Sequence, residues 1–564
     1  MTWRTFLVIL LGTLLLAGCS PASVSAPPAP SPATSPGGEA KPTPPAASNN
    51  PSRNTSQDNA GSTRRGGKLV RVFRDPPTLD PHLTTDTASA NFIVEIFGGL
   101  VTIDRDLQIV PDLAENWDVS SDGQVYTFHI RPDAKFHDGR PVTAKDVQWS
   151  LERAADPATQ SPIASQYLGD IVGVNDKLAG AAASIEGVRV IDDRSIEITI
   201  DAPKSYFLAK LSYPTGFVLD RKTVEADPAN WLRHPNGTGP FKLEEYVIGE
   251  RIRLTRNDAY HLGPPHLDEV EFILSGGNSM LMYENDEVHL TGVGLADLER
   301  LQDPNSPLNA ELHRAPPSFR VDYIGMNVEQ PPFDDPKLRQ ALNLAFDRKS
   351  IANSVLEGLV IPARGIIPPG FPGFNPDLPD FTYDPELARQ LLSESRYGKD
   401  LGQLPPITLS IAGGFGASLS LDLEVILQAW EELGVRGEIQ QTEWATFLQD
   451  LHGGRYDMFY SGWIADYPDP ENFLDVLFHS ESENNHTNYH NAEVDTLLEQ
   501  ARVEPDRAAR FRLYNRAERM ILNDAPWVIL WNRGEGYALI KPNVRDYHLA
   551  PIVIPKLRYV YFQE

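Results

Sequence analysis

Cysteine is almost absent from this sequence, because Cys19 is the only one among 564 residues. A chain with a single thiol cannot form an internal disulfide, which excludes a fold built on a disulfide framework. Cys19 follows Leu16-Ala17-Gly18 at the end of a short apolar run, residues 6–16, that comes after Arg4. This run is too short to span a bilayer, and the whole pattern is typical of an export signal.

The end of this segment resembles a bacterial lipobox, in which the cysteine carries lipid and becomes the mature N-terminus. We therefore predict that residues 1–19 are a lipoprotein signal peptide and that Cys19 is the lipidation site. The lipoprotein modification supplies more than one acyl chain, which anchors a protein stably to a membrane. An ordinary signal peptide with an incidental cysteine is the alternative. No other segment is apolar enough to predict a transmembrane helix.

Basic residues are scarce relative to acidic ones. The chain has 50 Lys and Arg against 77 Asp and Glu, for a formal net charge of −27. A nucleic-acid-binding protein needs a basic face, so this balance argues against nucleic acid as a partner. It mildly favours neutral or cationic ligands.

Large apolar side chains are nearly missing from residues 20–66, which are rich in Pro, Ser, Ala, Gly and Asn. Such a segment cannot bury a core, and we predict a disordered tether between a membrane and a folded body. The remaining roughly 500 residues are too many for one core, so two or three domains are expected.

Local signals in the folded part predict alternating helices and strands. Asp335-Pro336 and Asp384-Pro385 each place an N-cap residue before a proline suited to the first helical position. Further on, residues 407–411 read as a strand, 419–433 as a helix and 435–439 as a second strand. This β-α-β order predicts a parallel sheet in an α/β lobe.

A stretch near residue 466 carries the most distinctive chemistry. Trp463 and Tyr467 bracket Asp466, and an apolar run at 456–460 predicts a buried strand leading into them. Residues 462–470 are therefore expected on a loop at the carboxyl end of a strand, where open α/β sheets place ligand sites. A partly desolvated carboxylate beside flat apolar walls suits a cationic group such as an ammonium. The alternative is an Asx-type turn with the aromatics in the core.

The same chain resembles family 5 of the extracellular solute-binding proteins, the dipeptide-, oligopeptide- and nickel-binding components of ABC importers. Residues 111–157, PDLAENWDVSSDGQVYTFHIRPDAKFHDGRPVTAKDVQWSLERAADP, are similar to the signature region of that family. The resemblance continues in order through GTGPF at 237–241, NDAY at 257–260, PPFDDPKLRQALNLAFDRKSI at 331–351 and YDPELARQLL at 383–392. Residues 442–477 look most like the oligopeptide-binding branch.

The resemblance implies an α/β, bilobal periplasmic-binding-protein fold of the class with an extra domain, with two lobes joined by a two-strand hinge. The expected crossovers between the lobes lie near 318–325 and 532–537. The expected parts are lobe 1 at 67–101, 237–320 and 537–564, its extra domain at 102–236, and lobe 2 at 321–536.

The resemblance also implies a ligand site. Asp466 falls on the aspartate that pairs with a peptide's α-ammonium, and aromatic residues would wall side-chain pockets. The predicted ligand-binding residues are Asp466, Trp463, Trp444, Tyr467 and Tyr460. The basic residues that oligopeptide-binding relatives place near the ligand carboxylate are replaced here by Leu451, Tyr460 and Gln330, with His452 and Arg455 as nearby candidates.

No catalytic signature is found: the chain has neither Gly-x-Ser-x-Gly nor His-Glu-x-x-His. His479, His486 and His490 lie in a polar segment, for which we expect a solvated loop and no metal. We predict no catalytic residues and no cofactor.

The predicted protein is a lipid-anchored monomer on the outer face of the cytoplasmic membrane that captures oligopeptides and delivers them to an ABC permease. The same fold binding a glycan, an opine or a nickel chelate is the alternative, and a secreted hydrolase is the third hypothesis.

Overall fold

The computed structural model describes residues 63–64, 66–413 and 421–563. The predicted signal peptide, the lipidation site Cys19 and the tether up to residue 62 lie outside the described residues. The tether was predicted to run to residue 66, but β1 (Thr63–Arg64) pairs antiparallel with β22 (Tyr561–Gln563), so the fold begins earlier than expected. No helix within the described part of the chain is long and apolar enough to cross a membrane.

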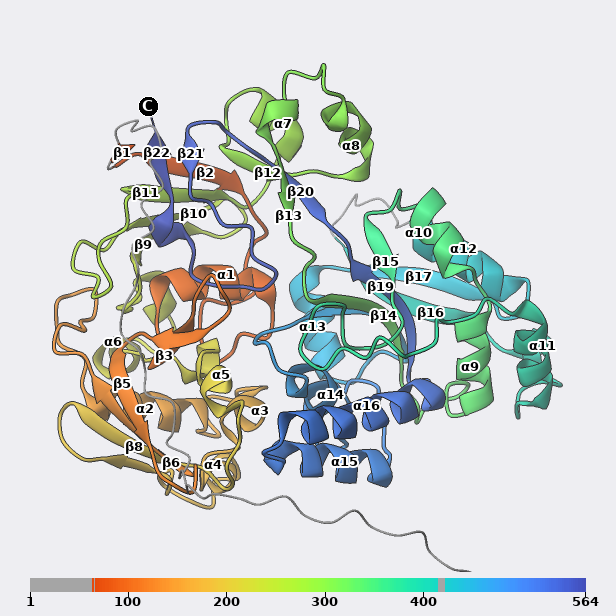
Figure 1. The fold of residues 1–564 in the computed structure, drawn as a ribbon, viewed down its shortest axis with the longest axis horizontal. Coiled ribbons are helices and arrows are strands. Elements are labelled where there is room, and N and C mark those ends of the chain that lie inside the picture. The colour runs from red at the N-terminus through yellow and green to blue at the C-terminus, as the bar shows by residue number, and fades with distance from the viewer. Residues whose placement is uncertain (1–62, 65, 414–420, 564) are drawn as a thin grey trace, which may run out of the picture. The chain divides into compact units, whose positions relative to one another are not determined.

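A seven-stranded mixed sheet forms the centre of one half of the fold (Figure 1). Its order is β13-β20-β12-β2-β11-β10-β9, with β2 parallel to β11 and β12 and the other pairs antiparallel. The helix α1 (Thr87–Ile96) contributes Phe92, Ile93 and Ile96 to its core. The strands are β2 (Lys68–Val72), β9 (Phe241–Val247), β10 (Arg251–Arg256), β11 (Glu269–Ile273), β12 (Leu290–Gly292), β13 (Leu312–Ala315) and β20 (Gly536–Ile540).

A separate four-stranded antiparallel sheet, order β5-β6-β8-β7, lies within residues 114–199 and has its own apolar core. Its strands are β5 (Ala114–Val119), β6 (Val125–Ile130), β7 (Val188–Val190) and β8 (Ser195–Thr199). Buried and partly exposed side chains alternate along β6 and β8, as period 2 requires. The helix α2 (Ala144–Ala154) starts at a capping box formed by Thr143 and Asp146. That residues 102–236 form a separate domain stays a prediction.

A six-stranded sheet, order β15-β19-β14-β18-β16-β17, forms the centre of the other half. The predicted β-α-β unit is confirmed: β16 and β17 are parallel, with α12 (Leu421–Glu431) between them in sequence. The second strand starts two residues later than expected, because the backbone N–H of Val435 donates to the carbonyl of Trp430 and closes the turn after α12. The strands are β14 (Arg320–Met326), β15 (Val360–Pro362), β16 (Ile407–Ala412), β17 (Gly437–Thr442), β18 (Met458–Ile464) and β19 (Trp527–Arg533).

The aspartate-proline signals mark two helices of this half correctly. Asp335 accepts a hydrogen bond from the first turn of α9 (Pro336–Leu344), and Asp384 does the same for α11 (Pro385–Glu394). Four further helices carry or support the site described below: α13 (Trp444–His452), α14 (Glu471–Phe478), α15 (Ala492–Val503) and α16 (Arg507–Asp524). The remaining elements are β3 (Val101–Ile103), β4 (Ile109–Pro111), β21 (Val544–Arg545), α3 (Ala164–Leu168), α4 (Val174–Leu178), α5 (Phe207–Leu211), α6 (Arg221–Ala226), α7 (Ser279–Glu284), α8 (Leu295–Gln302) and α10 (Arg348–Ser354).

The chain passes twice between the seven-stranded and six-stranded sheets. We call residues 66–315 and 536–563 the first lobe and residues 320–533 the second lobe. The crossings are residues 316–319, between β13 and β14, and residues 534–535, between β19 and β20 (Figure 1). The first crossing comes earlier than predicted, because β14 already belongs to the second sheet from Arg320 onward. This is a bilobal α/β fold.

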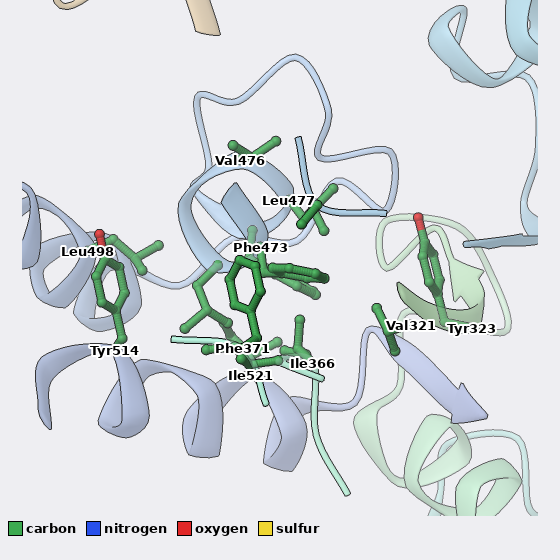
Figure 2. Packing of buried hydrophobic residues seen from close by; sticks show 14 of the residues in the cluster. Val321, Tyr323, Ile366, Phe371, Phe473, Val476, Leu477, Leu498, Tyr514 and Ile521 are labelled. Carbon is green, nitrogen blue, oxygen red and sulfur yellow. The ribbon is translucent and has the colours of Figure 1, made fainter. Parts of the chain in front are cut away.

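An apolar cluster holds α14 against the sheet of the second lobe, as Figure 2 shows. The rings of Phe473 and Phe371 meet edge to face at 5.0 Å, and Tyr323 stacks on Trp527 at 3.4 Å. Burying a phenylalanine side chain contributes roughly 1.5–3 kcal/mol. Ala465 and Tyr467, which flank Asp466, belong to the same cluster, so this packing also positions the loop before α14.

Candidate ligand-binding site

A cavity of about 400 Å³ lies between the two lobes. The first lobe contributes residues 85–87 and 212–214 to its lining, and the second lobe contributes residues 460–466 and part of α13. Four of the five residues predicted to bind a ligand line this cavity: Trp444, Tyr460, Trp463 and Asp466. Its volume falls in the range of pockets that hold small molecules, about 300–1,000 Å³.

Asp466 lies two residues beyond the end of β18, at the exit of the strand. The prediction that all of residues 462–470 form a loop is wrong, because Gly462, Trp463 and Ile464 pair with β14. The Tyr167 hydroxyl donates to Asp466 Oδ2 at 2.5 Å, and Asn472 Nδ2 donates to the same oxygen at 3.2 Å. Within the described part of the chain, Oδ1 accepts no hydrogen bond.

The carboxylate of Asp466 has no cationic partner among the described residues. Burial raises its pKa to about 6 from the ordinary 3.8, although the hydrogen bonds from Tyr167 and Asn472 oppose this shift. No backbone N–H of residues 66–413 or 421–563 donates to the carboxylate, so the Asx-turn alternative does not describe it. The geometry leaves a partly dehydrated anion with one free oxygen in a cavity wall, which suits a cation supplied from outside.

Tyr167 was not expected at this site, because it comes from α3 in the first lobe, 299 residues before Asp466. Its ring stacks on Tyr213 with centroids 4.0 Å apart, and the Tyr213 hydroxyl donates to the carbonyl of Thr84 at 3.2 Å. The first lobe thus orients a hydroxyl toward the carboxylate of the second. No local sequence signal identifies such a pair.

Two tryptophans form aromatic walls, and both are partly buried. Trp463 Nε1 donates to Asn472 Oδ1 at 3.3 Å, which fixes its ring beside the loop of Asp466. Trp444, at the start of α13, directs its Nε1 toward Asp86 Oδ1 at 3.5 Å, and the Arg74 guanidinium lies 5.0 Å from its ring centre. Asp86 also caps α1, so Trp444 meets the first lobe at a helix end.

Tyr467 does not line the cavity, and this corrects the prediction that it contacts a ligand. Its side chain is fully buried in the core of the second lobe, and its hydroxyl donates to the carboxylate of Glu471. Glu471 in turn forms an ion pair of 2.9 Å with Lys210 of the first lobe, which also pairs with Asp170 at 3.1 Å. A buried charge cluster therefore joins the lobes behind Asp466.

Only some of the positions that are basic in oligopeptide-binding relatives line the cavity. Leu451 and Tyr460 line the cavity, as does the candidate His452, whereas Gln330 does not. Arg455 is exposed and pairs with Asp450 outside the cavity.

The cavity has arginines that sequence reasoning missed. Besides Arg74, these are Arg320 and Arg533, which we call the arginine pair. Arg320 Nε donates to Asp322 Oδ1 at 2.6 Å, and Arg533 Nε lies 2.9 Å from Asp322 Oδ2. They come from the ends of β14 and β19, so only the folded sheet brings them together.

The histidine segment is not the solvated loop that we expected. His479 is buried and His486 lines the cavity with its ring 5.1 Å from that of His452, while His490 is exposed. Burial lowers the pKa of His486 to about 3 and also lowers that of His452, so both rings are neutral at pH 7. No cluster of three or more potential metal ligands occurs in the described ranges.

Comparisons with known proteins agree with this arrangement. Residues 108–485 match the model for bacterial extracellular solute-binding proteins, family 5. The periplasmic oligopeptide-binding protein OppA of Escherichia coli is 32% identical over 485 residues, covering 83% of this chain and 87% of OppA. The probable deoxycholate-binding periplasmic protein YgiS of E. coli is 31% identical, covering 88% of this chain and 93% of YgiS.

Among solved structures, the E. coli murein tripeptide binding protein MppA superposes with a TM-score of 0.80 at 27% identity, covering 89% of this chain and 99% of MppA. These relatives are binding proteins and not enzymes. The bilobal fold, the cavity between the lobes and the match over most of the chain lead to one conclusion: this chain belongs to family 5 of the bacterial extracellular solute-binding proteins.

Proposed function

We propose that this protein captures short peptides with a free N-terminus and presents them to an ABC permease. The observation that carries the proposal is Asp466, a partly buried carboxylate that has a free oxygen and no counterion from the described chain. An ammonium group supplies the missing charge and up to three N–H donors. The names of OppA and MppA, which specify oligopeptides and a tripeptide, support the same ligand class.

The walls of the cavity suit a ligand whose side chains vary. Trp444 and Trp463 offer flat apolar area that tolerates many side chains. The Tyr167 hydroxyl reaches Asp466 Oδ2 from the first lobe, so the two lobes are already linked at the carboxylate whose other oxygen would receive the ligand. A peptide held here contacts both lobes and stabilises their closed arrangement, which is the state that a permease could recognise.

The proposal places the protein on the outer face of the cytoplasmic membrane, held by lipid on Cys19 and acting as a monomer. The support for the anchor is the sequence around Cys19, which lies outside the described residues. Metabolic labelling with a radioactive fatty acid tests it: the wild type should incorporate label and Cys19→Ser should not.

Calorimetry with trialanine and N-acetyl-trialanine tests the role of Asp466. Trialanine should bind the wild type, and Asp466→Asn should weaken binding at least tenfold, because breaking a desolvated charge pair costs about 3–5 kcal/mol. Acetylation removes the ammonium and should have the same effect on the wild type. Asp118→Asn removes an exposed carboxylate of the first lobe and serves as the matched control. Equal affinity of Asp466→Asn and wild type for trialanine would contradict the proposal.

A second candidate is a non-peptide solute such as an anionic steroid acid. It is favoured by the relationship to YgiS and by the apolar residue Leu451 at a position that is basic in peptide-binding relatives. Native mass spectrometry of the purified full-length protein separates the candidates, because a retained peptide and a retained steroid differ in mass. Such an acid carries no cation, so its binding should not depend on Asp466.

A further inference from the structure

The arginine pair lies where the chain crosses between the lobes. Arg320 is the first residue of β14, directly after the first crossing, and Arg533 is the last residue of β19, directly before the second. The two strands are antiparallel neighbours, with Val321 opposite Asn532. Both arginines line the cavity, so two cations stand at its hinge side.

Asp322 holds the pair in place without neutralising it. This carboxylate is fully buried and approaches one Nε of each arginine, at 2.6 and 2.9 Å. Two guanidinium groups share one carboxylate, which leaves one net positive charge in the wall. In the described part of the chain, neither side chain forms any other hydrogen bond or ion pair. The outer N–H groups of both guanidinium groups are therefore free to donate to an anion.

Gly462 makes the arrangement possible. It stands opposite Asp322 in the register between β18 and β14. A Cβ at this position would lie 2.3 Å from Arg320 Nη2 and 2.4 Å from Asp322 Oδ1, so a larger residue would displace the guanidinium. The bare backbone lets Arg320 lie flat against β18 beside the cavity.

We propose that the arginine pair is the subsite for the carboxylate at the far end of the ligand, opposite the ammonium on Asp466. The proposal rests on the peptide-binding function proposed above and narrows its substrate class to short zwitterionic peptides. It accounts for the replacement of the expected basic residues by Leu451 and Tyr460, because the positive charge comes from the neighbouring strands.

The spacing of the two charges sets the length of the ligand. The Arg320 guanidinium lies beside Gly462, four residues before Asp466, which corresponds to at most about 13 Å along a strand. An extended peptide advances by about 3.3–3.6 Å per residue. Peptides of three or four residues therefore match the distance between the ammonium and carboxylate ends.

Arg74 is the competing cation in the cavity. It comes from the first lobe and packs over the ring of Trp444, and no carboxylate among the described residues fixes its position. A subsite needs a charge held in one geometry, and the buried Asp322 provides this only to the arginine pair.

Two peptide libraries test the proposal: mixed tri- and tetrapeptides as free acids, and the same peptides as C-terminal amides. Full-length protein is incubated with each library, and the retained peptides are quantified by native mass spectrometry. The wild type should retain acids at least tenfold better than amides. Arg320→Gln and Arg533→Gln should each reduce this preference to threefold or less, while retention of amides stays within twofold of wild type.

Arg455→Gln, which removes an exposed arginine outside the cavity, should keep the full preference. If Arg320→Gln fails to fold, Arg533→Gln still decides the question, because Asp322 remains paired with Arg320. Equal retention of acids and amides by the wild type would overturn the subsite while leaving peptide binding intact. Loss of the preference in Arg74→Gln alone would also overturn it. If the wild type retained neither library, the proposed peptide-binding function would itself be wrong.

Discussion

The affinity of this cavity for an ammonium group should fall about tenfold between pH 7 and pH 5. The reason is Asp466, whose pKa burial raises to about 6. At pH 7 about nine-tenths of the carboxylate is ionised, and at pH 5 about one-tenth is. Only the ionised form attracts the ammonium, so the apparent dissociation constant should rise as the pH falls through 6.

The raised pKa of Asp466 also affects the stability of the ligand-free protein. A carboxyl whose pKa is higher in the folded state than in the unfolded state binds more protons when folded. Its contribution to stability is therefore lost as the pH rises from about 4 to about 6. The difference between 3.8 and about 6 corresponds to about 3 kcal/mol of destabilisation at pH 7. Asp466→Asn should consequently unfold at a higher temperature than ligand-free wild type at pH 7 but not at pH 4.

The assay is a series of trialanine titrations by calorimetry between pH 5 and pH 7.5, with melting curves at each pH. His452 and His486 line the same cavity, and burial lowers the pKa of both. The pKa of His486 falls to about 3, so this ring stays neutral across the range. Asp466→Asn should bind weakly and without the pH dependence. A wild-type affinity that stays constant from pH 5 to pH 7 would contradict a role for Asp466 ionisation in binding, as would an equal pH dependence in the variant.

Three further predictions concern groups around the cavity. Tyr167→Phe removes a hydrogen bond that lowers the pKa of the cavity carboxylate, so the midpoint of the affinity profile should move to higher pH, measured by the same titrations. Lys210→Met leaves Glu471 buried without its cation, and urea unfolding should show a loss of about 3–5 kcal/mol, much of it recovered in the double variant with Glu471→Gln. Gly462→Ala should displace the adjacent guanidinium and reduce the preference for free-acid over amidated peptides, whereas Gly402→Ala, with open space around its Cβ, should not.

Much of the architecture could be predicted from local signals. The caps at Asp335 and Asp384 and the β-α-β order at 407–442 depend on residues close together in the chain, and the structure confirms them. Boundaries were less accurate where tertiary pairing extends an element. The strand β18 continues through Trp463 and Ile464, because β14 provides hydrogen-bonding partners that no local pattern reveals.

The family, the α/β class and the candidate anion at Asp466 could be inferred before folding was considered, because these depend on short-range patterns and on motif order. Which side chains contact one another in the cavity depends on the folded chain. Tyr467 is buried in the core although it adjoins Asp466 in the chain, while Tyr167 reaches the carboxylate from the other lobe. Arg320 and Arg533 likewise come together only in the folded sheet, where both contact Asp322. Pairing of β14 with β19 joins two strands that are distant in sequence.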